Sequence, residues 1–232
     1  MNLFDATVLS FLNQFAQRSW TLDTIIVFIS ANYLAKGVIF ITLFWWAWFR
    51  HGQDGNEERE FLLYSGFACV PAVLVARGLA LTLPFRLRPI ADAALNFRVP
   101  YGMERGNYEA WSSFPSDHAA LFFTLAIGLL FVSRVAGAVA VCYAFFVICL
   151  PRIYLGIHYP TDIIAGALLG AGAAYLSKPQ NIRKGVTRAA LRWSERHPGS
   201  FYAFFFFFSF QIATLFDSLR SVGRFVYSAL RP

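Results

Sequence analysis

Charged residues are scarce in this chain. Asp, Glu, Lys and Arg make up 14% of its 232 residues, whereas a soluble domain has about 25%. Hydrophobic residues rise to 57% in the same sequence. This composition excludes an ordinary soluble domain and predicts a polytopic membrane protein, and the length suits a single domain.

Cysteine is also rare, and it lacks the spacing of a metal site. The three cysteines lie inside apolar segments and none forms a CxxC pair, which argues against a disulfide framework. The acids Asp92, Glu104 and Glu109 are too scattered for a Mg²⁺ site. The sequence therefore predicts no metal and no cofactor.

Apolar segments of nearly spanning length dominate what remains. A helix crosses a bilayer core with about 20 residues. The candidate spans are residues 34–49, 61–84, 117–133, 135–150, 159–177 and 200–216. The stretch 3–31 is also apolar, but Asp5, Arg18 and Asp23 interrupt it, so we expect interfacial or re-entrant helices there. The predicted fold is an all-α membrane helix bundle with about five or six spans, and the depth of 200–216 stays open.

The basic residues predict orientation rather than nucleic-acid binding. The net charge is +7, but the bases interrupt apolar runs or gather in loops instead of forming a continuous polar stripe. The segment 178–199 is the richest in cations, so the positive-inside rule makes it cytoplasmic. The loop 85–116 is then extracytoplasmic.

A turn at Arg134 decides where two histidines lie. Residues 119–150 carry a single charge, Arg134, and one helix of that length would extend about 48 Å, too long for a core of about 30 Å. We therefore expect two short spans that turn at Arg134. This hairpin returns His118 and His158 to the same side of the membrane.

Residues suited to phosphate chemistry cluster at the predicted outer ends of the spans. They are Arg86, Arg88, Ser116, Asp117, His118, Arg152, His158 and Asp162. Arginine binds phosphate oxygens bidentately. A neutral imidazole can attack phosphorus, while a protonated one can give its proton to the leaving oxygen. Pro160 suits a first helical turn, which puts Asp162 within reach of His158.

The order of these residues resembles a known family. Arg88-Pro89, "PSDH" at 115–118 and Arg152-x5-His158-x3-Asp162 resemble the three-part signature of the PAP2 (type 2 phosphatidic acid phosphatase) superfamily, over roughly residues 60–177. The resemblance implies a metal-independent phosphatase acting through a phosphohistidine. It makes His158 the nucleophile, oriented by Asp162, and His118 the general acid. The phosphoryl oxygens would be held by Arg88, Arg152 and Ser116.

The sequence departs from that signature at the first two motifs. Leu81 stands where the family has a lysine, and either Arg77 or Arg86 could supply the missing cation. Asp117 replaces the commoner glycine, which puts a carboxylate beside an anionic substrate. "PSDH", the short loop between spans and the N-terminus resemble the bacitracin-resistance branch. Its members are undecaprenyl-pyrophosphate phosphatases, which recycle the lipid carrier of the bacterial wall.

Four parts are expected: an N-terminal interfacial or re-entrant segment (1–33), a PAP2-like catalytic membrane domain (34–177), a basic cytoplasmic loop (178–199) and a C-terminal hydrophobic segment and tail (200–232). The resemblance predicts a multi-pass protein of the bacterial plasma membrane whose site faces outside and binds polyprenyl pyrophosphate or another lipid phosphate. Its partners would be membrane lipids and not nucleic acid; no oligomeric state is predicted.

Other functions stay open. The same fold could act on phosphatidylglycerophosphate or phosphatidate, or transfer phosphate to a second lipid. A transporter or scaffold should carry charges near mid-membrane, whereas here the polar groups other than Arg77 gather at one interface. The glycines Gly166, Gly170 and Gly172 are expected to form a close-packing helix face.

Overall fold

The protein is all-α throughout the residues that the computed structural model describes, which are 1–50, 55–104, 106, 108 and 111–216. The predicted all-α class is therefore confirmed for these residues; the end of the predicted C-terminal tail lies outside this range. The helices are α1 (Leu3–Asn13), α2 (Trp20–Ala31), α3 (Tyr33–Phe49), α4 (Asn56–Thr82), α5 (Asp117–Val132), α6 (Arg134–Tyr143), the π-helix η2 (Ala144–Cys149), α7 (Leu150–Tyr154), α8 (Pro160–Tyr175), α9 (Gln180–Arg196) and α10 (Pro198–Ala213). A short 3₁₀ helix, η1 (Ala93–Leu95), lies in the long loop after α4.

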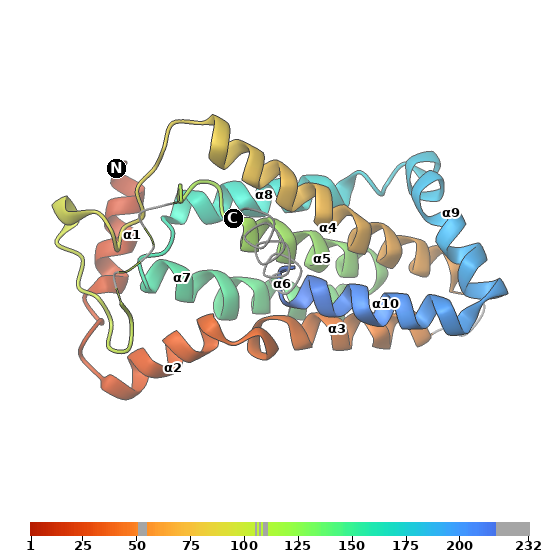
Figure 1. Ribbon diagram of the computed structural model, residues 1–232, viewed down its shortest axis with the longest axis horizontal. Helices are drawn as coiled ribbons and strands as arrows, with labels where there is room; N and C mark the ends of the chain where they lie inside the picture. The colour runs from red at the N-terminus through yellow and green to blue at the C-terminus, as the bar shows by residue number, and fades with distance from the viewer. Residues whose placement is uncertain (51–54, 105, 107, 109–110, 217–232) are drawn as a thin grey trace, which may run out of the picture.

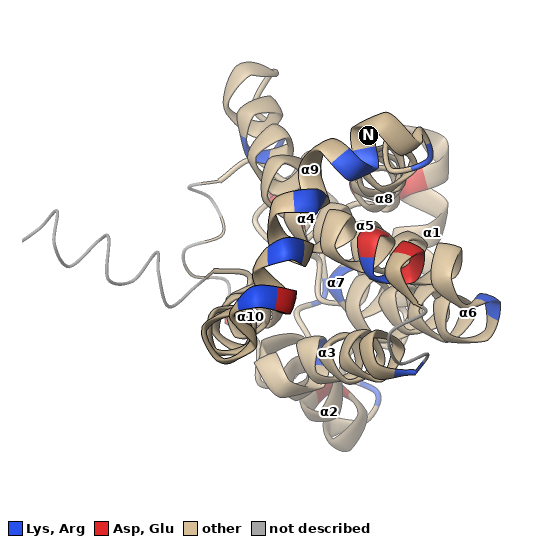
Figure 2. Cartoon of the chain, turned by 90° about the vertical axis from the view of Figure 1, so that its right-hand side faces the viewer, with Lys and Arg blue, Asp and Glu red and all other residues tan. Residues whose placement is uncertain are grey.

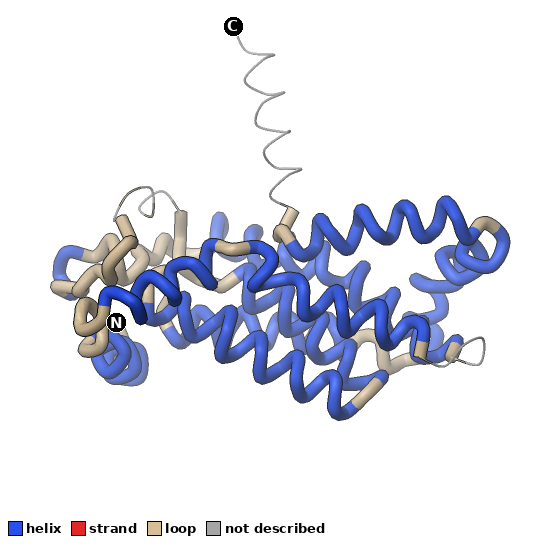
Figure 3. The backbone as a smooth tube through the Cα atoms, turned by 90° about the horizontal axis from the view of Figure 1, so that it is seen from below, coloured by secondary structure: helices blue, strands red, loops and turns tan. Residues whose placement is uncertain are grey.

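Most of the long helices run side by side, and two further helices cross the ends of the bundle. α5 packs against α4, α6 and α8, while α10 packs against α3 (Figure 1). α1 lies across one end and α9 across the opposite end (Figure 1). Figure 3 shows that most of the non-helical chain collects at the end where α1 lies. The site described below is built at that end.

The predicted hairpin between the two histidines is confirmed. α5 ends at Val132 and α6 begins at Arg134, with Ser133 in an extended conformation between them. The Ser133 side chain accepts a hydrogen bond from the amide of Ala136, which caps the start of α6. α6, η2 and α7 then continue as one helix from Arg134 to Tyr154. Its π-helical turn precedes Pro151, whose missing N–H breaks the regular α-helical hydrogen bonding.

Helix length accounts for two or three of the predicted membrane crossings within the described residues. α4 and the helix Arg134–Tyr154 are long and apolar enough to cross a bilayer. α2 and α3 meet at a bend of 56° and add a third span if the pair counts as one. α5, at 16 residues, extends only about 24 Å. The predicted spans do coincide with helices, but most of these helices are short.

Two glycines bring α5 and α8 into close contact. A Cβ at Gly166 would lie 2.2 Å from the carbonyl oxygen of Ser116, and one at Gly170 would lie 2.3 Å from that of Ala120. The predicted packing face is confirmed at both. It is wrong at Gly172, where nothing lies within 4 Å of an added Cβ. Two residues turn a helix by about 200°, so Gly172 faces away from α5.

The opposite end of the bundle is held by a buried ion pair. Arg183 of α9 is 3% exposed and donates from Nε to Glu60 of α4 at 3.0 Å and from Nη2 to Glu57 at 2.8 Å. Its guanidinium also lies 4.1 Å from the ring centre of Phe61. These contacts fasten the basic helix α9 to α4.

Candidate active site

The nucleophile candidate His158 lies in the turn that leads into α8. It is 3% exposed, and its Nδ1 lies 2.8 Å from the carbonyl oxygen of Ser113. A carbonyl oxygen only accepts, so Nδ1 carries the proton and Nε2 presents a lone pair. Burial lowers the pKa of His158, although Asp162 opposes the change. The imidazole is therefore held neutral in one tautomer.

Asp162 lies close to that imidazole but hydrogen-bonds elsewhere. Its Oδ2 is 3.7 Å from Nδ1 of His158 and accepts from the amide of Tyr159 at 2.8 Å. Its Oδ1 accepts from Arg86 at 2.5 Å. Its backbone carbonyl accepts from the amide of Ser116 at 3.1 Å, which ties the start of α8 to the start of α5. The second and third motifs therefore meet at one end of the bundle, as predicted.

The second histidine is paired with the residue before it. Nδ1 of His118 lies 2.9 Å from Oδ1 of Asp117, and the other oxygen of Asp117 accepts from Arg77. Because an ionised carboxylate only accepts, Nδ1 of His118 carries a proton. Arg77, considered above as a replacement for the family lysine, therefore has a carboxylate partner within the protein.

Arg86 is even more completely occupied. Besides Asp162 it donates to Asp5 at 2.6 Å and to Thr161 at 2.9 Å. Its guanidinium lies 4.0 Å from the ring centre of Tyr159. Both terminal nitrogens of the Arg86 guanidinium are thus hydrogen-bonded to protein groups.

Arg152 is an arginine whose side chain, within the described residues, has a hydrogen-bond donor left over for a ligand. It is 7% exposed, and its Nε has no hydrogen-bond partner in the described chain. It lines a cavity of about 170 Å³ together with Arg88, Tyr108 and part of α2. Typical small-molecule sites measure about 300–1,000 Å³, so this cavity suits a headgroup rather than a tail.

Arg88 contributes a second positive charge to this cavity. Its Nε donates to the carbonyl oxygen of Trp111 at 3.3 Å, and burial lowers the pKa of its guanidinium. The charges of Arg88 and Arg152 both act on His158, and that of Arg152 acts also on His118. Ser116, expected to hold phosphate, is fully buried and accepts from the amide of Ala119 at 3.3 Å, capping α5.

Sequence reasoning missed three groups that shape this end of the bundle. Ser113 supplies the carbonyl for His158, and two buried carboxylates, Asp5 and Asp23, come from the N-terminal helices. An acidic residue inside an apolar segment indicates a functional position, and both aspartates stand in such segments. No sequence signal pointed to the Ser113 carbonyl. In the described part of the chain no group of three or more His, Cys, Asp or Glu residues is arranged to hold a metal ion.

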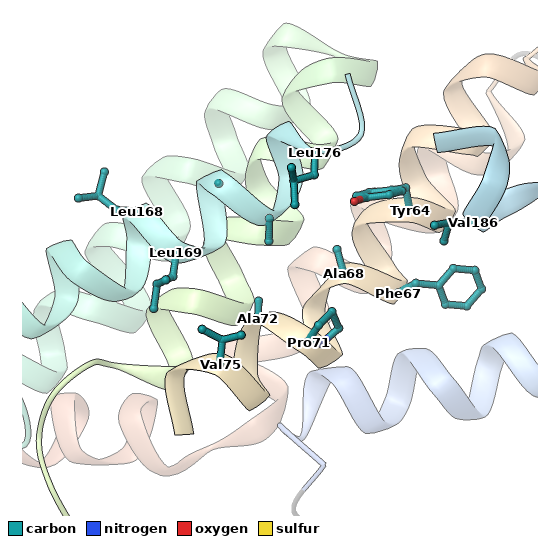
Figure 4. Close-up of a pocket in the computed structure, with 12 residues that line it drawn as sticks. Tyr64, Phe67, Ala68, Pro71, Ala72, Val75, Leu168, Leu169, Leu176 and Val186 are labelled. Atoms are coloured by element: carbon teal, nitrogen blue, oxygen red, sulfur yellow. The ribbon is translucent and has the colours of Figure 1, made fainter. Parts of the chain in front are cut away.

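An apolar pocket of about 460 Å³ lies between α4 and α8. Figure 4 shows Ala68, Ala72 and Val75 on one wall and Leu169 and Leu176 on the other. α4 leads into Arg86 and Arg88, and α8 follows His158 directly. The pocket itself is lined by the second half of α8, from Leu168 onward, and by Val186 of α9, so it lies toward the end of the bundle opposite the polar site.

Comparisons with known proteins agree with this arrangement. The model of the PAP2 superfamily matches residues 61–184. The chain is 25% identical over 164 residues to the bacitracin transport permease protein BcrC of Bacillus licheniformis, covering 71% of this chain and 74% of the relative. It is 26% identical over 156 residues to the undecaprenyl-diphosphatase BcrC of Bacillus subtilis (strain 168), covering 67% and 72%.

A shorter similarity links the chain to the lipid A 4'-phosphatase of Bacteroides thetaiotaomicron, at 40% identity over 90 residues, which is 38% of this chain and 36% of the relative. No solved structure matches the chain. The family match covers more than half of the sequence and contains all three motifs, whose residues converge at one end of the bundle. This chain is therefore a member of the PAP2 superfamily.

Proposed function

We propose that this PAP2 phosphatase hydrolyses undecaprenyl pyrophosphate to undecaprenyl phosphate and phosphate through a phosphohistidine. One observation carries the proposal: a neutral His158 with Nδ1 fixed lies beside Arg152, which is buried with an unpaired Nε. A buried guanidinium without a full set of acceptors is costly, and a phosphoryl group would supply them.

In the first chemical step, Nε2 of His158 attacks the terminal phosphorus. The bond between that phosphorus and the bridging oxygen breaks, and His118, which must enter this step protonated on both nitrogens, gives its Nε2 proton to the departing undecaprenyl phosphate. Arg88 and Arg152 stabilise the charge on the phosphoryl oxygens. Asp117 holds Nδ1 of His118, so that Nε2 is the nitrogen that delivers the proton.

In the second step, water attacks the phosphohistidine. His118, now neutral, takes the proton from that water, phosphate leaves, and Nε2 of His158 regains its lone pair. Asp162 supports the nucleophile through its charge and through the backbone of Tyr159. No step calls for a metal ion.

The lipid class is proposed from the apolar pocket and the relatives. An apolar pocket between α4 and α8, the two helices that adjoin the polar site, suits a long hydrocarbon tail. The BcrC relative of Bacillus subtilis is named an undecaprenyl-diphosphatase, and that substrate is extended here to this chain. Phosphatidylglycerophosphate, phosphatidate and transfer to a second lipid are the alternatives that the assay below separates.

We also propose that the site opens at the outer face of the bacterial plasma membrane, in a bundle of five or six crossings. Figure 2 shows basic residues following one another along α9, which lies at the end opposite the site. The positive-inside rule makes that end cytoplasmic.

The direct test is a lipid panel with purified protein. Undecaprenyl pyrophosphate, phosphatidylglycerophosphate and phosphatidate are compared, with EDTA present, and phosphate release is measured. We expect the fastest release from undecaprenyl pyrophosphate and none from His158→Ala. Faster turnover of a glycerophospholipid would show that this lipid, and not undecaprenyl pyrophosphate, is the substrate. Loss of activity in EDTA would refute the metal-independent route. A wild type that releases phosphate from none of the lipids would refute the function.

A further inference from the structure

The N-terminal helix α1 sends a buried carboxylate into the catalytic end of the bundle. Asp5 is fully buried, although it stands in an apolar helix of 11 residues. Its Oδ1 accepts from the amide of Thr161 at 2.9 Å, and its Oδ2 accepts from the Thr161 hydroxyl at 2.7 Å and from Arg86 at 2.6 Å. Burial acts to raise the pKa of Asp5, but these hydrogen bonds and the charge of Arg86 outweigh it and lower the pKa.

Arg86 joins Asp5 to the residues around the nucleophile. One end of its guanidinium binds Asp5, the other binds Asp162, and its plane lies over the ring of Tyr159. One cation thus lies between two buried carboxylates that are 157 positions apart in the sequence. The positive charge between them offsets part of the cost of burying two carboxylates.

Together these contacts fix the first turn of α8. The first helical amides have no partner within a helix, and acids near them are favourable. Asp162 binds the amide of Tyr159, and Asp5 binds that of Thr161. His158 directly precedes this turn, so its place depends on the angle at which α8 begins.

The second N-terminal helix closes the cavity that holds the arginines. Val27, Ser30 and Ala31 of α2 line it together with Arg88 and Arg152. At the start of α2, the buried carboxylate of Asp23 accepts from the hydroxyl of Tyr154, two residues after Arg152. It also accepts from the amide of Tyr101, at 2.8 Å, in the outer loop.

Building on the proposed function, we propose that Asp5 is a positioning residue that holds His158 in register through Arg86 and the first turn of α8. The α1–α2 pair, which lies outside the matched family segment 61–184, is then part of the active site. Arg86 acts in this arrangement as a clamp within the protein and not as a ligand of the substrate.

The test uses purified full-length variants and undecaprenyl pyrophosphate, or whichever lipid of the panel the wild type hydrolyses. Asp5→Asn keeps the shape and removes the charge. Because a misplacement of about 1 Å costs roughly 100-fold, we expect kcat to fall by about 10- to 100-fold. KM should change less than about 3-fold, since the tail pocket and Arg152 are untouched. Asp5→Glu, which keeps the charge, should recover part of the loss.

Thr7→Ala is the matched control on the same helix. Thr7 is exposed and, among the described residues, its hydroxyl bonds only to Leu3 of its own helix, so kcat should stay unchanged. A double-mutant cycle with Arg86→Gln asks whether Asp5 acts through Arg86. In the Arg86→Gln background, Asp5→Asn should lower kcat by less than about a further 3-fold. A thermal unfolding curve in detergent checks that each variant is folded.

Should Asp5→Asn fail to fold, Thr161→Val replaces it in the test. That change keeps both charges and removes one hydroxyl between them, so we expect kcat to fall about 5-fold with an unchanged KM. The proposal is overturned if folded Asp5→Asn keeps more than half of the wild-type kcat, if its loss lies in KM, or if its effect multiplies fully with that of Arg86→Gln. A wild type without phosphatase activity would instead refute the function itself, and this proposal with it.

Discussion

Gly166 offers a test of the packing that joins the two histidine motifs. A Cβ there would lie 2.2 Å from the Ser116 carbonyl oxygen and 2.9 Å from the Cβ of Ala119. To restore ordinary contact, α5 and α8 must separate by about 1 Å beside the site. The carbonyl belongs to backbone, so it cannot rotate away as a side chain would.

We expect Gly166→Ala to lower the free energy of unfolding by about 1–3 kcal/mol, the usual cost of overpacking. Because the separation falls between His118 and His158, kcat should fall by roughly 100-fold. Gly185→Ala in α9 is the control, since a Cβ there meets nothing within 4 Å and the residue lies far from the site. Replacing a helical glycine at an open position should raise stability by about 0.5–1 kcal/mol and leave kcat unchanged.

Both variants are compared by chemical or thermal unfolding in detergent and by phosphate release from the lipid substrate. The reasoning is refuted if Gly166→Ala is as stable and as active as Gly185→Ala. It is also refuted if Gly166→Ala unfolds readily but keeps full activity when folded, because the two motifs would then not depend on the α5–α8 contact.

Three further results are expected. The acid limb of kcat/KM should lie below pH 6.5, because burial lowers the pKa of His158 and only the neutral imidazole attacks; a limb above that value would contradict a neutral nucleophile. Arg152→Lys keeps the charge but loses the guanidinium fork, so kcat/KM should fall by about 100-fold; an equal activity would mean that Arg152 does not hold phosphate. Arg183→Ala leaves Glu60 buried without its partner and should destabilise the protein by about 3 kcal/mol, measured by unfolding, whereas an unchanged midpoint would show that the pair is dispensable.

The helices followed closely from the sequence because their apolar runs end at polar residues. The turn near Arg134 was predicted from length alone, and Ser133 marks it in the structure. The number of crossings did not follow as well. An apolar composition indicates that a helix is buried, but it does not distinguish burial in lipid from burial in protein. α5 is apolar, yet it is shorter than a typical span and lies in the centre of the bundle.

The site was predictable as a set of residues and not as a set of contacts. Motif spacing named His118, His158 and Arg152, but Arg86 was only one of two candidates for the missing substrate-binding cation, and its guanidinium binds Asp5 and Asp162. Such a pairing joins residues about 80 positions apart, and no local pattern encodes it. The Ser113 carbonyl is likewise invisible in sequence, because any residue type supplies the same backbone atom.

The central claim is that His158 carries the phosphoryl group between the lipid and water. Undecaprenyl pyrophosphate labelled with ³²P on its terminal phosphate is mixed with enzyme and quenched in base, which preserves phosphohistidine. We predict label on the wild-type protein at His158 and none on His158→Ala. Label that persists on His158→Ala, or that maps to His118, would contradict the account.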